Sequence, residues 1–205
     1  MAAVTVDSVE AATRHHPHAR AVLSPAAAGA ASPSHAYLFH GPPGAGKADA
    51  ARAFAADLIA DGAANPADAR RRALAGVHPD MTWVRPTGAA EMLVGDIDEA
   101  VVMAATRTPF ESRRRVFVIE RADTLTDQAA NRLLKTLEEP PPFAHLILLA
   151  GRIGDVLPTI RSRCLAVRFE ALTADQLADH LIDEHACEPE LARSSARLAR
   201  GDARR

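Results

Sequence analysis

A glycine-rich turn near residue 41 carries the residues best suited to bind phosphate. Gly41, Gly44 and Gly46 lead directly to Lys47, with an apolar run before them and a helix-forming run after them. Such a turn can aim several backbone N–H groups into one pocket at a helix N-terminus, which favours an anion. The spacing fits the phosphate-loop pattern G-x-x-x-x-G-K-[S/T], whose lysine reaches the β- and γ-phosphates. The sequence therefore predicts a nucleotide-phosphate site.

Two positions of this predicted site lack residues that support ATP hydrolysis. Ala48 stands where the pattern has a hydroxyl that holds Mg²⁺. Glu120 takes the place of the metal-associated acid at a strand end, and Arg121, which stays protonated, stands where a Glu often handles the attacking water. We expect ATP to bind weakly or without hydrolysis. The predicted nucleotide-binding residues are Gly41, Gly44, Gly46, Lys47, Ala48 and Glu120.

Alternating strands and helices are expected to position these residues in parallel βαβ units. Capping patterns indicate helix starts at Asp96, Thr126 and Thr173, the last together with Gln176. The predicted strands lie at about residues 37–40, 81–85, 115–120, 145–150 and 166–169. The predicted helices lie at about residues 4–12, 17–23, 49–60, 63–76, 96–108, 126–139, 157–160, 173–184 and 188–200.

Composition limits the classes of function. The chain has 205 residues, 48% of them hydrophobic, which is enough for one main core and a small second unit. A net charge of −2 excludes a global basic field for binding nucleic acid by this chain alone. Two cysteines offer no disulfide framework, no secretory signal is visible, and the longest apolar stretches are far short of a membrane span. We expect a cytoplasmic protein without a membrane segment.

Several polar groups admit a functional and a plain structural interpretation, and the plain one is favoured in each case. The histidines at 15, 16 and 18 fit a solvated helix start better than a metal site. Three consecutive arginines fit a solvated face better than a phosphate or partner contact. Cys164 fits a small buried residue, and a His and Cys set fits a polar helix face. The arginines are Arg70, Arg71 and Arg72, and the His and Cys set is His180, His185 and Cys187.

Four stretches resemble the delta-prime subunits of bacterial DNA polymerase III clamp loaders, which are AAA+ relatives. They are residues 35–47, 78–80, 122–140 and 159–164, in that family's order. The resemblance implies an α/β fold, a P-loop AAA+ parallel sheet flanked by helices, followed by the start of a small helical lid domain. It divides the chain into a helical and loop lead-in (1–34), an AAA+ domain (35–170) and a partial lid (171–205), without the family's collar domain.

The resemblance also implies roles for particular residues. Arg163 is expected to act as an arginine finger on ATP held by a neighbouring motor subunit; the plain alternative is a surface arginine paired with Glu170 or Asp155. Arg204 lies near the sequence position at which motor-type relatives have a second phosphate-sensing arginine. The family often binds zinc after the first helix, but residues 61–77 contain no cysteine, so no zinc and no other metal site is predicted.

The function implied is that of a non-catalytic, stator-like subunit that assists ATP-dependent loading of the sliding clamp onto primed DNA. The implied partners are the motor subunits, the delta subunit, the sliding clamp and primed DNA within the assembly. One alternative is an active AAA+ ATPase, either a motor-type subunit or another P-loop NTPase. Another is a small P-loop kinase, in which the Ser162-Arg163-Cys164 stretch has no role.

Overall fold

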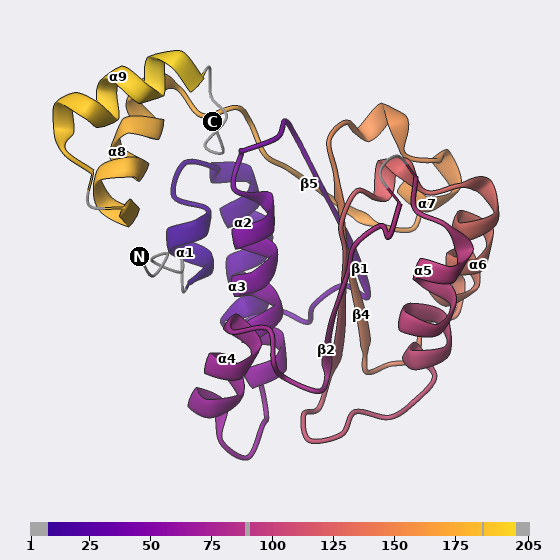
Figure 1. Cartoon of the computed structure of the whole chain (residues 1–205). Helices are drawn as coiled ribbons and strands as arrows, with labels where there is room; N and C mark the ends of the chain where they lie inside the picture. The colour runs from indigo at the N-terminus through magenta and orange to yellow at the C-terminus, as the bar shows by residue number, and fades with distance from the viewer. Residues whose placement is uncertain (1–7, 89–90, 186, 200–205) are drawn as a thin grey trace.

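A five-stranded parallel sheet forms the centre of the computed structural model, which describes residues 8–88, 91–185 and 187–199 (Figure 1). The strands are β1 (Ala36–His40), β2 (Met81–Val84), β3 (Arg115–Ile119), β4 (Ala144–Ala150) and β5 (Leu165–Arg168). Their order across the sheet is β2-β3-β4-β1-β5, and every neighbouring pair is parallel. The predicted parallel α/β architecture is confirmed.

Helices cover both faces of this sheet (Figure 1). One layer contains α1 (Val9–Ala12), α2 (Pro17–Ala27), α3 (Lys47–Ala60) and α4 (Pro66–Leu74). The opposite layer contains α5 (Val94–Ile97), the π-helix η1 (Asp98–Met103), α6 (Asp127–Glu138) and α7 (Pro158–Arg161). The 3₁₀ turns η2 (Ala122–Thr124) and η3 (Ile153–Asp155) follow β3 and β4, and α8 (Ala174–His185) and α9 (Pro189–Ala199) come last.

The strand side chains divide between two hydrophobic cores. Tyr37 and Phe39 of β1 belong to the core beneath α2 and α3, whereas Ala36 and Leu38 belong to the core beneath α6. This alternation follows from the two-residue period of a strand. Every residue of β4 is buried, as expected for a strand covered on both faces. The apolar runs in the sequence therefore mark the central strands.

The last two helices have a small core of their own. Leu172, Leu177, Ala178, Ala192 and Ala196 form a buried cluster distinct from the two cores on the sheet. The predicted capping box at the start of α8 is confirmed: the Thr173 N–H donates to Gln176 Oε1 at 2.9 Å, and the Gln176 N–H donates to Thr173 Oγ1 at 3.2 Å. Thr126 likewise caps α6, because its Oγ1 accepts from the Ala129 N–H at 3.3 Å.

The prediction for the helix at residue 96 was wrong in its start and its regularity. The helix begins at Val94, and Asp96 lies inside its first turn, where the carboxylate accepts the Leu93 N–H at 2.9 Å and the Thr87 N–H at 3.3 Å. The chain then continues as a π-helix over Asp98–Met103. A carboxylate that reaches back to N–H groups ahead of the helix gives the same local sequence signal as an N-cap.

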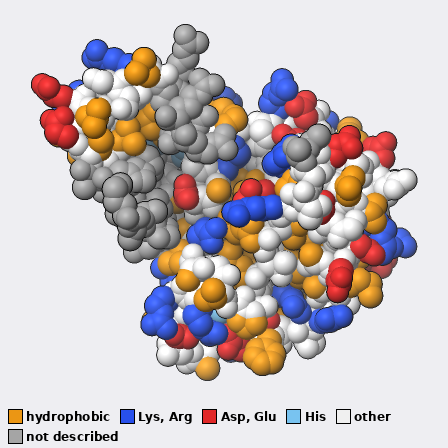
Figure 2. All heavy atoms as spheres, in the orientation of Figure 1, with side chains coloured by type: hydrophobic (Ala, Val, Ile, Leu, Met, Phe, Trp, Pro, Cys, Tyr) orange, Lys and Arg blue, Asp and Glu red, His pale blue; other side chains and the backbone are white. Residues whose placement is uncertain are grey.

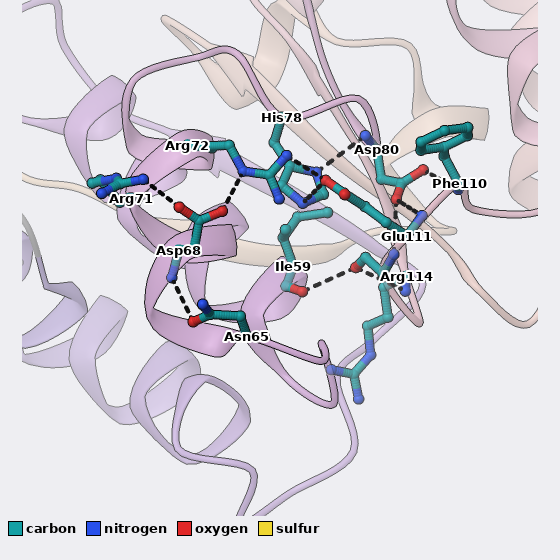
Figure 3. Close-up of polar contacts among 11 residues, drawn as sticks. Ile59, Asn65, Asp68, Arg71, Arg72, His78, Asp80, Phe110, Glu111 and Arg114 are labelled. Carbon is teal, nitrogen blue, oxygen red and sulfur yellow. Dashed lines mark hydrogen bonds and ion pairs between the residues drawn. The ribbon is translucent and has the colours of Figure 1, made fainter.

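The three consecutive arginines of α4 form ion pairs within the chain. Figure 3 shows Arg71 and Arg72 with their partners. Arg70 lies 2.7 Å from Asp57, and Arg71 pairs with Asp68. Arg72 pairs with Asp68 at 2.8 Å and with Glu111 at 2.5 Å. The pair with Glu111 connects α4 to the segment before β3. The visible face of the molecule accordingly mixes basic, acidic and hydrophobic side chains (Figure 2).

Candidate nucleotide-binding site

The glycine-rich loop joins β1 to α3 and needs its glycines for two separate reasons. Gly44 and Gly46 have φ of 72° and 77°, left-handed conformations that residues with a Cβ rarely adopt. Gly41 is excluded from having a side chain by its neighbour, because a Cβ there would lie 2.0 Å from the carbonyl oxygen of Phe169. The loop is therefore held tightly against the chain that follows β5.

Lys47 opens α3 and is hydrogen-bonded to its own loop. Its ammonium donates to the carbonyl of Gly41 at 2.5 Å and to that of Pro42 at 2.6 Å. Ala48 follows it in the first turn of the helix. The backbone N–H groups of this first turn have no helical partner and make the N-terminus attractive to an anion.

A cavity of about 600 Å³ opens at this loop. Its walls come from the loop itself (residues 43–49), from the turn after β3 and from the end of β4 (residues 149–151), together with the N-terminal segment and Leu172. The turn contributes Glu120, Arg121, Asp123 and Thr124, and the N-terminal segment contributes Ala11, Ala12, Arg14, His15 and His16. The carboxyl ends of parallel strands are where such sheets place their ligands. The structure thus brings the predicted residues Gly44, Gly46, Lys47, Ala48 and Glu120 to one cavity.

Glu120 lies at the cavity but has two side-chain partners of its own. Its Oε1 accepts from Trp83 Nε1 at 2.5 Å and from Arg85 Nε at 3.0 Å, both from β2 or just after it. These charge-assisted bonds tie the carboxylate to the neighbouring strand. One oxygen of the acid is therefore held at the strand end by residues of the neighbouring strand and the chain just after it.

The turn after Glu120 is held in place by hydrogen bonds of its own. Arg121 has φ of 54°, and both the N–H and the Oγ1 of Thr124 donate to its carbonyl at 2.8 Å. Asp123, which was not among the predicted site residues, accepts the Gly151 N–H at 2.8 Å and joins the turn to the end of β4. Its position soon after β3 could have predicted that Asp123 lies at the site, since the carboxyl ends of the strands meet at one edge of the sheet.

The N-terminal segment supplies a wall of the cavity that the sequence patterns did not predict. His16 is only 5% exposed, so the prediction of a solvated helix start was wrong for this residue. Its ring lies 4.9 Å from that of Phe169, and its Nδ1 accepts the Glu170 N–H at 3.4 Å. Burial lowers the pKa of His16, and the neighbouring His15 lowers it further. These partners lie about 150 residues away in sequence, so no local pattern could have revealed them.

Arg163 lies in the turn between α7 and β5, outside the lining of the cavity. Its guanidinium pairs with Glu138 at 2.7 Å and donates to the Thr159 carbonyl at 2.9 Å. The alternative pairing with Glu170 or Asp155 was wrong, because those acids pair with Arg168 at 3.1 Å and Arg152 at 3.0 Å. Arg204 lies outside the described residues.

No metal-binding cluster is formed by the residues that the structure describes. Within them, no three His, Cys, Asp or Glu side chains gather as a set that could hold a metal ion. Cys164 is half-buried against the core beneath α6, not fully buried as expected, and burial raises the pKa of its thiol to about 12. Among the same described residues, no helix is long and apolar enough to cross a membrane.

The sheet order, the phosphate loop after β1 and the acid at the end of β3 define a P-loop α/β fold. Solved structures share this fold: one of the Thermotoga maritima RuvB Holliday junction branch migration motor has a TM-score of 0.62 at 18% identity, over 98% of this chain and 62% of that one. A Thermotoga maritima DNA polymerase III gamma subunit-related protein has a TM-score of 0.58 at 20% identity, over 86% of this chain and 58% of that one.

Sequence comparison identifies the family within this class. The family described as "DNA polymerase III, delta subunit" matches residues 17–173, and the chain belongs to it. DNA polymerase III subunit delta' of Bacillus subtilis is 36% identical over 173 residues, covering 80% of this chain and 50% of that protein. The corresponding subunit of Pseudomonas aeruginosa is 37% identical over 142 residues, covering 67% of this chain and 43% of that protein.

A second type of subunit is also similar. DNA polymerase III subunit gamma/tau of Mycobacterium bovis is 39% identical over 151 residues, covering 68% of this chain and 25% of that protein. The chain thus spans half or less of the length of these curated relatives. The resemblance seen in the four sequence stretches is confirmed at the level of the family.

Proposed function

We propose that this chain is a non-catalytic, stator-like subunit of a DNA polymerase III clamp loader. In that role it assists motor subunits in the ATP-dependent loading of a sliding clamp onto primed DNA, with the delta subunit as a further partner. The observation that carries the proposal is the position of Arg163, which lies outside the chain's own cavity. In the cavity itself, Ala48 and Arg121 replace the hydroxyl and the acid that ATP hydrolysis needs at these positions.

Arg163 is suited to act on a nucleotide held by a neighbouring subunit. Its side chain is 35% exposed, and its two terminal nitrogens are held within the chain, Nη2 by Glu138 and Nη1 by the Thr159 carbonyl. A side chain that is already ordered loses little conformational entropy when it docks on a partner. Arginine fingers of this kind neutralise charge on the transferring phosphate and raise rates by about 10³ to 10⁵.

The test is ATP turnover by motor subunits reconstituted with this chain, a sliding clamp and primed DNA. Replacing Arg163 with alanine is expected to lower clamp- and DNA-stimulated turnover at least tenfold, about 1.4 kcal/mol of barrier, while gel filtration shows an intact assembly. Arg168→Ala is the matched control, because Arg168 pairs with Glu170 at the surface. Equal ATP turnover with the unchanged chain and with Arg163→Ala would contradict the assignment of Arg163 as an arginine finger.

A second candidate is a working ATPase of the motor type. It is favoured by the 39% identity with the gamma/tau subunit and by the intact Lys47. The two candidates differ in the isolated chain: Mg²⁺-dependent ATP turnover that is abolished by Lys47→Ala would support the motor, whereas the stator proposal expects no turnover above the Lys47→Ala background.

We also propose the domain boundaries that the resemblance implied, with the AAA+ domain ending near residue 170 and a partial lid following it. The separate core of α8 and α9 supports a boundary at this point. Limited proteolysis tests it: the first cuts should fall near residue 171, between Phe169, which packs in the main core, and the lid.

A further inference from the structure

The magnesium ion that phosphate-loop proteins of this class use does not fit the residues of this cavity. Such an ion is held by the hydroxyl after the loop lysine and by an acid at the end of the neighbouring strand. Ala48 has no hydroxyl, and Glu120 Oε1 is already bonded to Trp83 at 2.5 Å and to Arg85 at 3.0 Å. Asp123 Oδ2 accepts the Gly151 N–H at 2.8 Å. One oxygen of each of these two carboxylates is thus engaged by the protein itself.

The same cavity contains a cation where an acid would stand in a hydrolysing enzyme. Arg121 lines it together with Lys47, and Arg14 adds a third positive charge from the N-terminal segment. A guanidinium stays charged and binds phosphate oxygens in a bidentate manner, so it can neutralise a polyphosphate without any metal.

The backbone of Arg121 is also fixed in a way that suits a binding residue. Its left-handed φ of 54° is the one positive value at a non-glycine position in the described part of the chain. Two bonds from Thr124 hold its carbonyl, and Asp123 fastens the same turn to β4. Strained backbone of this kind persists where surrounding contacts determine it, and it tends to occur at ligand sites.

We propose that this cavity binds the polyphosphate of a nucleoside triphosphate without a divalent cation, and that Arg121 and Lys47 supply the positive charge that Mg²⁺ supplies elsewhere. The inference rests on the assignment of this cavity as a nucleotide site, and it deepens the stator proposal. Nucleotide bound in this way lacks the metal that stabilises the charge of the transferring phosphate, so it remains intact. The site would then hold ATP as a structural ligand.

The experiment is isothermal titration calorimetry of the full chain with ATP, in buffer with excess MgCl₂ and in buffer with excess EDTA. ATP is expected to bind more weakly in MgCl₂ than in EDTA, because excess Mg²⁺ converts nearly all of the ATP to its magnesium complex and a site that takes no metal must compete for the metal-free form. Arg121→Asn is expected to weaken binding at least tenfold in EDTA. Asparagine suits the test because it tolerates the left-handed backbone. Thermal unfolding of the variant checks that it folds.

Two further variants make the test specific. Arg107→Glu changes an exposed arginine outside the cavity lining and should leave ATP affinity unchanged. Arg121→Glu restores an acid and should lower affinity in EDTA by more than Arg121→Asn does, with part of the loss recovered by MgCl₂.

The outcomes separate this inference from the stator proposal. ATP binding that is at least tenfold tighter in MgCl₂ than in EDTA overturns metal-independent binding. The absence of binding in both buffers overturns the nucleotide site itself. Neither result bears on the proposed action of Arg163 on a neighbouring subunit, because that test measures ATP turnover by other subunits.

Discussion

Asp80 is a fully buried carboxylate that organises the segment before β3 (Figure 3). It accepts three consecutive backbone N–H groups, from Phe110 at 2.6 Å, Glu111 at 3.0 Å and Ser112 at 2.9 Å. A buried charge requires such partners, and these bonds also set the path of the chain into β3. Ser112 in turn donates its hydroxyl to the Ile59 carbonyl at 2.9 Å, which joins the segment to α3.

Asp80→Asn is therefore expected to destabilise the fold. The amide group would face at least one of the three N–H groups with its own N–H, leaving a donor buried without a partner. We expect the free energy of unfolding to fall by about 2–3 kcal/mol, measured by urea denaturation. Asp155→Asn serves as the control, because it removes only a surface pair with Arg152 and should cost a few tenths of a kcal/mol. Equal losses in the two variants would contradict the role given to Asp80.

Cys164 provides a second prediction at this scale. Burial raises the pKa of its thiol to about 12, and the thiolate is the reactive species. In a Cys187→Ser background, a thiol-alkylating reagent at about pH 8 should leave the native chain unmodified and label it once in urea, as counted by mass spectrometry. Rapid labelling of the native chain would show that Cys164 is accessible.

At the scale of elements, the phosphate loop is joined directly to the chain that follows β5. Phe169 packs in the main core, its carbonyl faces Gly41, and its N–H donates to the His40 carbonyl at 2.8 Å. His16 contacts the same segment from the N-terminal side. Three stretches that are distant in sequence thus meet at one edge of the sheet.

Gly41→Ala tests this joint. The new Cβ would lie 2.0 Å from a backbone oxygen, and its φ of 150° adds strain, so the loop or β5 must move. We expect a loss of roughly 3 kcal/mol in the free energy of unfolding, together with weaker ATP binding. Gly154→Ala is the matched control, since nothing lies within 4 Å of the place its Cβ would take and its φ is not positive. An unchanged unfolding curve for Gly41→Ala would show that the loop has room to shift.

At the scale of the whole molecule, four histidines contribute to pH dependence in the same direction. Burial is the main cause that lowers the pKa of His16, His40, His78 and His145 below the ordinary value of 6.5. The unfolded chain therefore binds protons more readily than the folded one as pH falls through this value. Their contribution to stability is fully present above pH 6.5 and is lost between that value and the lowered folded values.

We accordingly expect the free energy of unfolding to be lower near pH 5.5 than near pH 7.5, measured by urea denaturation in buffers of equal ionic strength. His145→Asn should reduce this difference, because asparagine cannot titrate but can keep the donor that faces the Ser34 carbonyl at 2.9 Å. A chain that becomes more stable as pH falls through this range would contradict the assignment of these histidines as buried neutral groups.

The sequence alone determined the order of strands and helices, the phosphate loop and the family. Apolar runs such as that of β4 mark strands buried on both faces, and the loop glycines with Lys47 form a local pattern that needs no tertiary information. Helix starts at Thr126 and Thr173 were predicted because a cap involves residues only three positions apart.

Only the tertiary structure decided what surrounds the phosphate loop. The burial of His16 against Phe169, the bonds of Glu120 to Trp83 and Arg85, and the ion pair of Arg163 with Glu138 all join distant parts of the chain. The partner of a charged or polar side chain depends on which strands become neighbours, and here β4 and β5 flank β1 although they follow it by more than 100 residues. Local periodicity carries no information about such neighbours, because it reports only which side of an element faces the core.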